Sequence, residues 1–235
     1  MRLLSREKFY DKFCLMEITY LGHSSFRIKG KKRIIVTDPY DESVGFKMPR
    51  VTADIVTVSH HHPDHNYLTG VKGTTKSEEP FVIDGPGEYE VGGVSIFGIA
   101  SDHDQSHGAQ RGENTIYLIN LDGLRLAHLG DLGHKLTEGQ LGELNGVDVL
   151  FIPVGGTYTI DDNQAIEVIG QIEPLIVVPM HYLTKEMKPD FGIKLTVEDF
   201  LKALGEETNK IKERLEISKD KLPEEREIVV LKRKQ

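Results

Sequence analysis

Short apolar runs, many of them rich in β-branched residues, recur along the whole chain and are separated by polar turns. Apolar runs of roughly four to eight residues bounded by turn formers are typical of buried strands. The expected strands are Glu17–Tyr20, Ser25–Ile28, Arg33–Thr37, Ile55–Val58, Phe81–Ile83, Val94–Gly98, Thr115–Ile119, Leu124–Ala127, Val149–Ile152, Leu175–Val178 and Ile228–Leu231. The segments Gly30–Lys32 and Asp122–Gly123 predict hairpin turns between neighbouring strands.

In three other segments the apolar residues are spaced as in an α-helix. Helices are expected at Thr137–Leu144, Asp162–Gln171 and Thr196–Leu215. The last begins with an acidic first turn, which favours a helix N-terminus, and its apolar positions predict an amphipathic helix that covers a sheet. Strands in both halves of the chain, with few helices between them, indicate an α/β fold in which two sheets face each other and the helices lie outside.

The segment His60–His65 (HHHPDH) directly follows the apolar strand predicted at Ile55–Val58. In extended chain, His60 and His62 point the same way and can bind one ion, since side chains alternate along a strand. Pro63 can open a turn or helix, so Asp64 and His65 are aimed differently and can bind a second ion. A purification tag or a low-complexity tract is disfavoured because the segment is internal and includes an aspartate. The hexapeptide therefore predicts half of a two-metal site.

Polar residues follow three further apolar runs. His103 comes after Val94–Ala100, Asp131 after the run that ends at His128, and His181 after the run that ends at Pro179. Loops at one rim of a sheet are where such folds collect functional residues. Taken singly, each has another explanation, namely a solvated loop histidine, a turn aspartate or a hydrogen-bonded core histidine. Their joint occurrence after the hexapeptide favours a shared metal site.

With these residues the chain resembles the metallo-β-lactamase superfamily, and more narrowly its cytoplasmic hydrolase branch related to the L-ascorbate-6-phosphate lactonases. The resemblance covers about Met16 to Lys185 and implies a four-layer αββα sandwich of two mixed β-sheets with helices outside. Besides the hexapeptide it rests on Leu21–Phe26, Thr37–Pro39, His103–Asp104, Arg111–Asn114, His128–His134, Pro153–Gly156 and Pro179–Tyr182.

The resemblance also implies the metal ligands. One ion would be held by His60, His62 and His103, the other by Asp64, His65 and His181, with Asp131 bridging the two. Asp38 would brace the ligand loop, although a turn or salt-bridged aspartate before Pro39 is a competing interpretation. A set of imidazoles and carboxylates without thiolate favours two divalent transition-metal ions, zinc first, with manganese and iron as alternatives.

The activity implied is metal-dependent hydrolysis, in which a metal-bridging hydroxide attacks a small ester, lactone or similar substrate without a serine or cysteine nucleophile. A phosphodiesterase or phosphonate hydrolase acting on a small anion is an alternative, and a non-catalytic metal-binding sensor or scaffold is an alternative of another class. The resemblance disfavours two related classes. A β-lactamase with a cysteine metal ligand would need that cysteine at the position of Asp131, whereas the only cysteine is Cys14, and a flavodiiron enzyme would carry glutamate where His62 stands.

Several residues are candidates for roles beside the ions. Asp64 is predicted to be catalytic as well as a ligand, and His134 is predicted to be the general acid, with a capping or surface histidine as an equal alternative. Arg111, Asn114 and Thr157 are predicted to bind substrate, Arg111 through an anionic group, although a solvated arginine and a helix-capping threonine are the plainer interpretations. His23, in the turn Gly22–Ser25, is expected to be structural.

The composition limits the kinds of binding partner. The chain has 29 Lys and Arg residues and 37 Asp and Glu residues, which gives a net charge of −8. It has no dense basic stripe in its sequence, and this disfavours nucleic acid as a partner. Bound divalent ions could still attract a small anionic substrate. A single cysteine and the lack of an apolar run of ~20 residues point to a cytoplasmic protein without a membrane span.

Domain organisation is expected to be simple. Residues 16–235 should form one hydrolase domain, which could form a homo-oligomer. Residues 1–15 are expected to be a dispensable extension, or to precede a true start at Met16.

Overall fold

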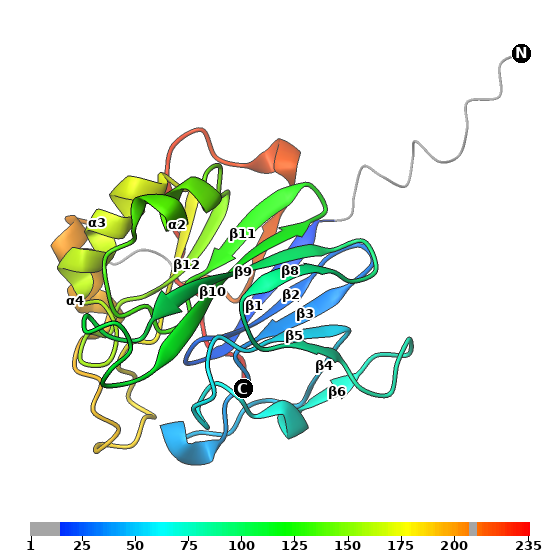
Figure 1. Ribbon diagram of the computed structural model, residues 1–235, viewed down its shortest axis with the longest axis horizontal. Helices are drawn as coiled ribbons and strands as arrows, with labels where there is room; N and C mark the ends of the chain where they lie inside the picture. Colours follow the sequence, from blue (N-terminus) through cyan, green and yellow to red (C-terminus); the bar gives the residue numbers. More distant parts are fainter. Residues whose placement is uncertain (1–14, 207–210) are drawn as a thin grey trace, which may run out of the picture.

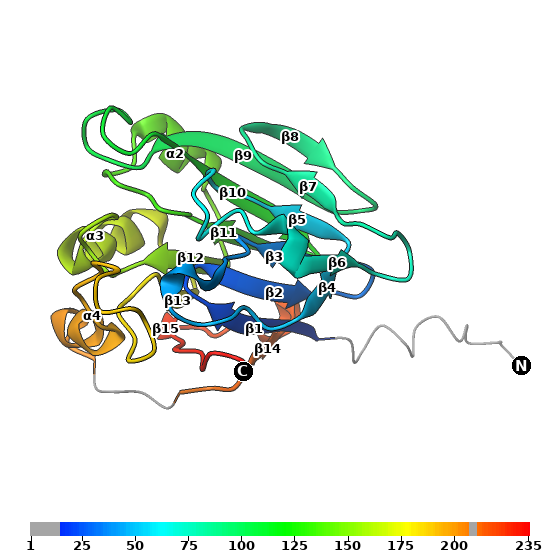
Figure 2. The ribbon, with the colours of Figure 1, turned by 90° about the horizontal axis from the view of Figure 1, so that it is seen from below.

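Two mixed β-sheets, stacked face to face, form the centre of the molecule (Figures 1 and 2). The computed structural model describes residues 15–206 and 211–235, so the predicted extension lies outside the described residues except for Leu15. The first sheet has the order β14 (Leu215–Ile217), β1 (Met16–Gly22), β2 (Ser25–Lys29), β3 (Ile34–Thr37), β5 (Ile55–Thr57) and β7 (Phe81–Ile83). The second has the order β15 (Glu227–Ile228), β13 (Ile176–Met180), β12 (Val149–Pro153), β11 (Leu124–His128), β10 (Glu113–Leu121), β9 (Ser95–Asp102) and β8 (Gly87–Glu90).

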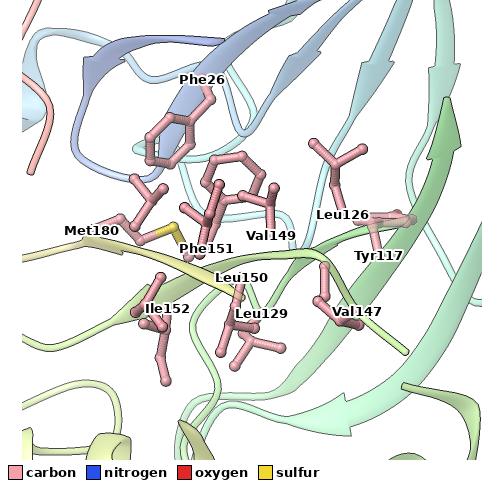
Figure 3. Packing of buried hydrophobic residues seen from close by; sticks show 14 of the residues in the cluster. Phe26, Tyr117, Leu126, Leu129, Val147, Val149, Leu150, Phe151, Ile152 and Met180 are labelled. Carbon is pink, nitrogen blue, oxygen red and sulfur yellow. The ribbon is translucent and has the colours of Figure 1, made fainter. Parts of the chain in front are cut away.

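The main core fills the space between the two sheets. Phe26 of β2 reaches across to Phe151 of β12, with ring centroids 4.4 Å apart (Figure 3). Both side chains are fully buried, as is Tyr117 of β10, whose hydroxyl donates to the carbonyl of Val58 at 2.8 Å. Burial of one such aromatic side chain contributes on the order of 1.5–3 kcal/mol, so the facing surfaces hold the sheets in a fixed relation.

Three α-helices lie together on one side of the molecule, next to strands of the second sheet (Figures 1 and 2). They are α2 (Glu138–Glu143), α3 (Asp162–Ile172) and α4 (Val197–Leu204), and each begins with a capping box, at Thr137, Asp161 and Thr196. In a capping box two otherwise unpaired backbone N–H groups gain partners, which explains where each helix begins. No helix among the described residues is long and apolar enough to cross a membrane.

The prediction of one helix from Thr196 to Leu215 was wrong. Helix α4 ends at Leu204, and Gly205 follows in the left-handed conformation at φ +76°, where glycine ends helices readily. Leu215 instead begins β14, which pairs antiparallel with β1. The amphipathic pattern did not distinguish a short helix followed by a strand from one long helix.

The outer face of the first sheet carries a second, smaller apolar cluster. It is covered by the 3₁₀ turns η1 (Glu42–Val44) and η2 (Leu68–Gly70) and by a two-stranded sheet of β4 (Val51–Ala53) and β6 (Val71–Gly73). The predicted α/β sandwich of two mixed sheets is therefore confirmed. Within the described part of the chain, however, the layer over the first sheet is built from these short pieces, and the three α-helices lie with the second sheet.

Candidate metal centre

Strand direction gathers the predicted ligands at one edge of each sheet. In the first sheet, β1, β3 and β5 run the same way, because β1 and β3 are both antiparallel to β2 and β5 is parallel to β3. In the second sheet, β9, β11 and β13 also share a direction. Their carboxyl ends lead into His23, Asp38 and the hexapeptide in the first sheet, and into His103, Asp131 and His181 in the second.

Cross-sheet hydrogen bonds join these strand ends. The backbone N–H of His181 donates to the carbonyl of His23 at 2.9 Å, and that of Thr115 donates to Ser59 at 2.8 Å. The buried ring of His128 donates from Nε2 to the carbonyl of Ser24 at 2.8 Å, while its Nδ1 accepts from the N–H of Gly130. The two edges therefore form one rigid cluster.

The structure brings all seven predicted ligands together. His60, His62 and His103 form one group whose ligand atoms lie within 4.8 Å of one another. Asp64, His65 and His181 form a second group, as predicted, which also includes His23. This arrangement of imidazole and carboxylate groups can bind metal.

Asp131 lies between the two groups. Its Oδ2 is 3.3 Å from Nε2 of His103, 3.4 Å from Nε2 of His65 and 3.0 Å from Nε2 of His181. The carboxylate is almost fully buried. It thus occupies the position that a bridging ligand needs, although bridging itself stays a prediction.

Asp38 and Ser59 set the orientation of two imidazoles. Asp38 is fully buried and accepts from the N–H and hydroxyl of Ser59, at 2.8 and 2.6 Å, and from Nδ1 of His65 at 2.9 Å. Because the only hydroxyl proton of Ser59 goes to Asp38, Ser59 accepts from Nδ1–H of His60 at 3.0 Å. Both rings therefore turn Nε2 toward the cluster, and this is the nitrogen that would coordinate a metal ion. The bracing role predicted for Asp38 agrees with these contacts.

The imidazoles of His60 and His65 differ in the direction in which their pKa values are shifted. Burial, reinforced by the nearby His65, lowers the pKa of His60 to about 2, so its ring stays neutral. Burial also acts against a charged His65, but the carboxylates of Asp131 and Asp64 outweigh it and raise the pKa of His65 well above its usual value. For Asp131, burial opposes ionisation, and the surrounding imidazoles of His181 and His65 nevertheless hold its pKa well below the ordinary range.

His23 was expected to be structural, and the structure places it in the cluster instead. Its Nε2 lies 3.1 Å from Oδ2 of Asp64 and 3.1 Å from Nε2 of His65. Burial lowers the pKa of His23 to about 4, so the ring is neutral near pH 7. The signal in the sequence was its position, since His23 follows the apolar run of β1 just as the predicted ligands follow theirs.

Unpaired buried atoms test whether the cluster fits metal ions. Among the described residues, no hydrogen-bond partner exists for Nε2 of His60, Oδ1 of Asp131, or Nδ1 of His23, His103 and His181. Leaving such groups buried without a partner costs on the order of 1–3 kcal/mol each. His23, Asp38 and His181 also adopt positive φ values, of 55°, 38° and 51°, which are uncommon for non-glycine residues and which turn these side chains at the strand ends. The donor set thus fits divalent transition metals.

A cavity of about 300 Å³ opens beside the cluster. One part of its lining consists of predicted ligands, His62, Asp64, His103, Asp131 and His181. The rest consists of Gln110, Arg111, Tyr158 and Phe191. Of the three residues predicted to bind substrate, only Arg111 lines this cavity. Gln110, Tyr158 and Phe191 were missed, because an aromatic residue or glutamine in a loop has no distinctive spacing.

Two substrate-binding predictions disagree with the structure. Asn114 is 1% exposed, and its amide accepts from the N–H of Asp131 and donates to Ser101 and the carbonyl of Leu129. Every one of these contacts is internal, so Asn114 positions the loop of Asp131. Thr157 is exposed at φ 55° and does not line the cavity, whereas the next residue, Tyr158, does.

His134 does not reach the metal cluster either. Its Nε2 accepts from the backbone N–H of Asp102 at 3.0 Å, and its Nδ1 donates to the carbonyl of Lys135 at 2.7 Å. It lines a different cavity, of about 480 Å³, together with Ser101 and Thr137. With both ring nitrogens engaged by backbone, His134 fastens the end of β9, and the geometry does not support the predicted role of general acid.

We therefore expect His134→Ala to slow a nitrophenyl ester and an ester with a poor leaving group by the same factor, with a lower melting temperature. Loss of the hydrogen bond to Asp102 would loosen the strand end that carries His103 without removing a proton donor. Comparing kcat for the two esters checks this. A loss of roughly 10²–10⁴-fold confined to the poor leaving group would restore the general-acid assignment.

Comparison with known proteins places this site in a family. Residues 17–181 match the model of the beta-lactamase superfamily domain. The chain belongs to the metallo-β-lactamase superfamily. A UPF0173 metal-dependent hydrolase of Thermococcus onnurineus is 30% identical over 220 residues, which cover 84% of this chain and 96% of that protein.

Solved structures agree with this assignment. A candidate zinc-dependent hydrolase of the metallo-β-lactamase superfamily from Thermotoga maritima has a TM-score of 0.73 and 39% identity, covering 92% of this chain and 98% of its own. The metallo hydrolase Igni18 of Ignicoccus hospitalis has a TM-score of 0.62 at 23% identity, covering 87% and 99%, and supports the fold alone. The predicted family and the class of metal-dependent hydrolase are confirmed, while the relation to ascorbate-6-phosphate lactonases stays a prediction.

Proposed function

We propose that this superfamily member uses two transition-metal ions, zinc by preference and manganese or iron as alternatives, to hydrolyse a small ester or lactone. The observation that carries the proposal is the convergence of two ligand groups, with Asp131 between them, on a cavity open to substrate. The ions when bound would act as Lewis acids and lower the pKa of a coordinated water. A cavity of about 300 Å³ suits a small substrate.

The lining of the cavity supports direct attack by water. Among the described residues that line it there is no serine, threonine, cysteine or lysine, so the wall offers no aliphatic hydroxyl, thiol or amine as a nucleophile. Asp64 has a side chain that is 20% exposed and lies within the lining. Although burial opposes it, the charge of His65 lowers the pKa of Asp64, so the carboxylate stays ionised and its negative charge is available to a metal ion. The predicted catalytic role of Asp64 rests on its place in the lining of the cavity.

The test is a hydrolysis screen of protein loaded separately with zinc, manganese and iron. Chromogenic esters, lactones and phosphodiesters form the three substrate panels. We expect turnover of esters or lactones that is lost on chelation and restored by metal. Turnover of phosphodiesters alone would favour the phosphodiesterase alternative, and full metal occupancy without turnover on any panel would favour a sensor or scaffold. Cytoplasmic location and homo-oligomer formation stay predictions.

A further inference from the structure

One arginine side chain lines the cavity beside the metal cluster. Apart from the histidines of the cluster, Arg111 is the only basic residue in its lining. Within the described part of the chain, no carboxylate lies at ion-pair distance from its guanidinium group. An arginine that faces a substrate cavity without an acidic partner retains its donors for a ligand.

The loop that carries Arg111 is fixed from behind. Oδ2 of Asp104, the residue after His103, accepts from the backbone N–H groups of Gln110 and Arg111 at 2.9 and 2.8 Å. The loop is therefore tied directly to a predicted metal ligand. A displacement of His103 and Asp104 would therefore move the backbone of Arg111 with it.

Tyr158 fixes the side chain itself. The guanidinium carbon of Arg111 lies 5.1 Å from the centroid of the Tyr158 ring, a cation–π contact. The Tyr158 hydroxyl donates to the carbonyl of Phe191 at 2.9 Å. The backbone of Gly192 passes so close that a Cβ there would lie 2.2 Å from the same hydroxyl. The ring has little room to move, and it supports one face of the guanidinium.

Phe191 links this pair back to the metal cluster. Its ring packs edge-on against His23, with centroids 5.5 Å apart and planes at 86°. Tyr158 and Phe191 thus form an aromatic part of the cavity lining, Tyr158 against Arg111 and Phe191 against His23. A substrate in this cavity would have the ligand cluster, aromatic rings and the donors of Arg111 within one lining.

We propose that Arg111, positioned by Tyr158, binds an oxyanion group on the substrate, so that the substrate class is a small anionic ester or lactone. The inference rests on the proposed hydrolase function and specifies its substrate. Arg111 contacts the carboxylate or phosphate of the substrate, away from the bond that is hydrolysed. Tyr158 acts through Arg111 and is a positioning residue.

Binding without turnover gives the first test. Butyrate, succinate and 3-phosphonopropionate are titrated calorimetrically into metal-loaded protein. All three can place one carboxylate on the metal ions, but only the last two carry a second anion for Arg111. We expect one of these dianions to bind about 10- to 100-fold more tightly than butyrate, the range of a charge-assisted hydrogen-bond pair. The preferred dianion distinguishes a carboxylate site from a phosphate site.

Arg111→Ala should bring that affinity ratio close to one, and Arg111→Lys should keep only part of it, because lysine retains charge but not the fork of donors. Lys135→Ala is the matched control. It removes a positive charge that lines the other cavity and pairs with Glu167, and it should keep the wild-type ratio. An equal ratio in wild type and Arg111→Ala would overturn the proposal, as would a wild-type ratio of one.

Kinetics give the second test, with 4-nitrophenyl butyrate and mono-4-nitrophenyl succinate as a neutral and anionic pair. Arg111→Ala should raise KM for the succinate ester about 10- to 100-fold more than for the butyrate ester, with little change in kcat. The preference of the wild type for the anionic ester is the ratio of the two KM values. Tyr158→Leu should lose part of this preference, and Tyr158→Phe, which keeps the ring, should retain it. An unchanged ratio in Tyr158→Leu would refute the positioning role. If neither ester is hydrolysed while the binding ratio still depends on Arg111, the hydrolase proposal fails and the anion site stands.

Discussion

Asp131→Ala is expected to remove at least one of two bound metal ions and to abolish most of the hydrolytic activity. One oxygen of Asp131 approaches imidazoles of both ligand groups, at 3.0–3.4 Å. Changing a residue that merely supports a metal ligand already lowers affinity or activity about 10- to 100-fold, so losing a shared ligand should cost at least as much. Elemental analysis after reconstitution should give about two ions per chain in the wild type and one or fewer in the variant.

Asp84→Ala is the control for this experiment, because Asp84 is exposed and lies outside the cluster, in the segment between β7 and β8. It should keep the metal content and activity of the wild type. Wild-type protein that takes up no metal from zinc, manganese or iron would contradict the two-metal proposal directly. Two ions retained in Asp131→Ala would show that Asp131 does not bridge.

The metal cluster could be anticipated from the sequence because its signals are local. Each predicted ligand follows an apolar run, and side-chain alternation in extended chain already pairs His60 with His62. What the sequence did not contain was the direction in which loop side chains point. His134 lies three residues after Asp131, yet its ring turns to the backbone of Asp102.

The places of His23, Tyr158 and Phe191 in the site depend on contacts between segments that are distant in the sequence. His23 is in a tight hairpin turn. It meets Asp64 because β1 and β5 end at the same edge of the first sheet, and it meets His181 because the two sheets face each other. Tyr158 meets Arg111 and Phe191 across three separate loops. No periodicity marks such residues, since loop conformation is set by tertiary packing.

Short strands were missed for a different reason. β4 and β6 have three residues each, and β8 has four, with a mostly exposed pattern. β7 is equally short but is continuously apolar (FVI), whereas these segments contain polar residues or glycine (VTA, VKG and GEYE) and lack the apolar run that marks a strand. Their pairing with neighbouring strands, rather than their own composition, makes them strands.

Gly133→Ala is expected to destabilise the fold and weaken metal binding together. A Cβ at Gly133 would lie 2.3 Å from the carbonyl carbon of His103 and 2.3 Å from the backbone nitrogen of Asp104. Both are main-chain atoms at the end of β9, so the strand end must shift and carry His103 with it. Overpacking of this kind costs about 1–3 kcal/mol, which lowers the melting temperature of a chain of this size by roughly 2–12 °C. Thermal unfolding of metal-free protein and a zinc titration measure the two effects.

Gly142→Ala provides the matched control, since it makes the same substitution in helix α2, where an added Cβ would meet nothing within 4 Å. Alanine is the better helix former by about 1 kcal/mol, so this variant should be as stable as the wild type or slightly more so, with unchanged zinc affinity. Equal melting temperatures and zinc affinities of the two variants would show that the end of β9 can move without loss of stability. Destabilisation of Gly133→Ala with normal zinc affinity would show that His103 keeps its place when the strand end moves, and that the metal cluster is held mainly from the first sheet through Asp38 and Ser59.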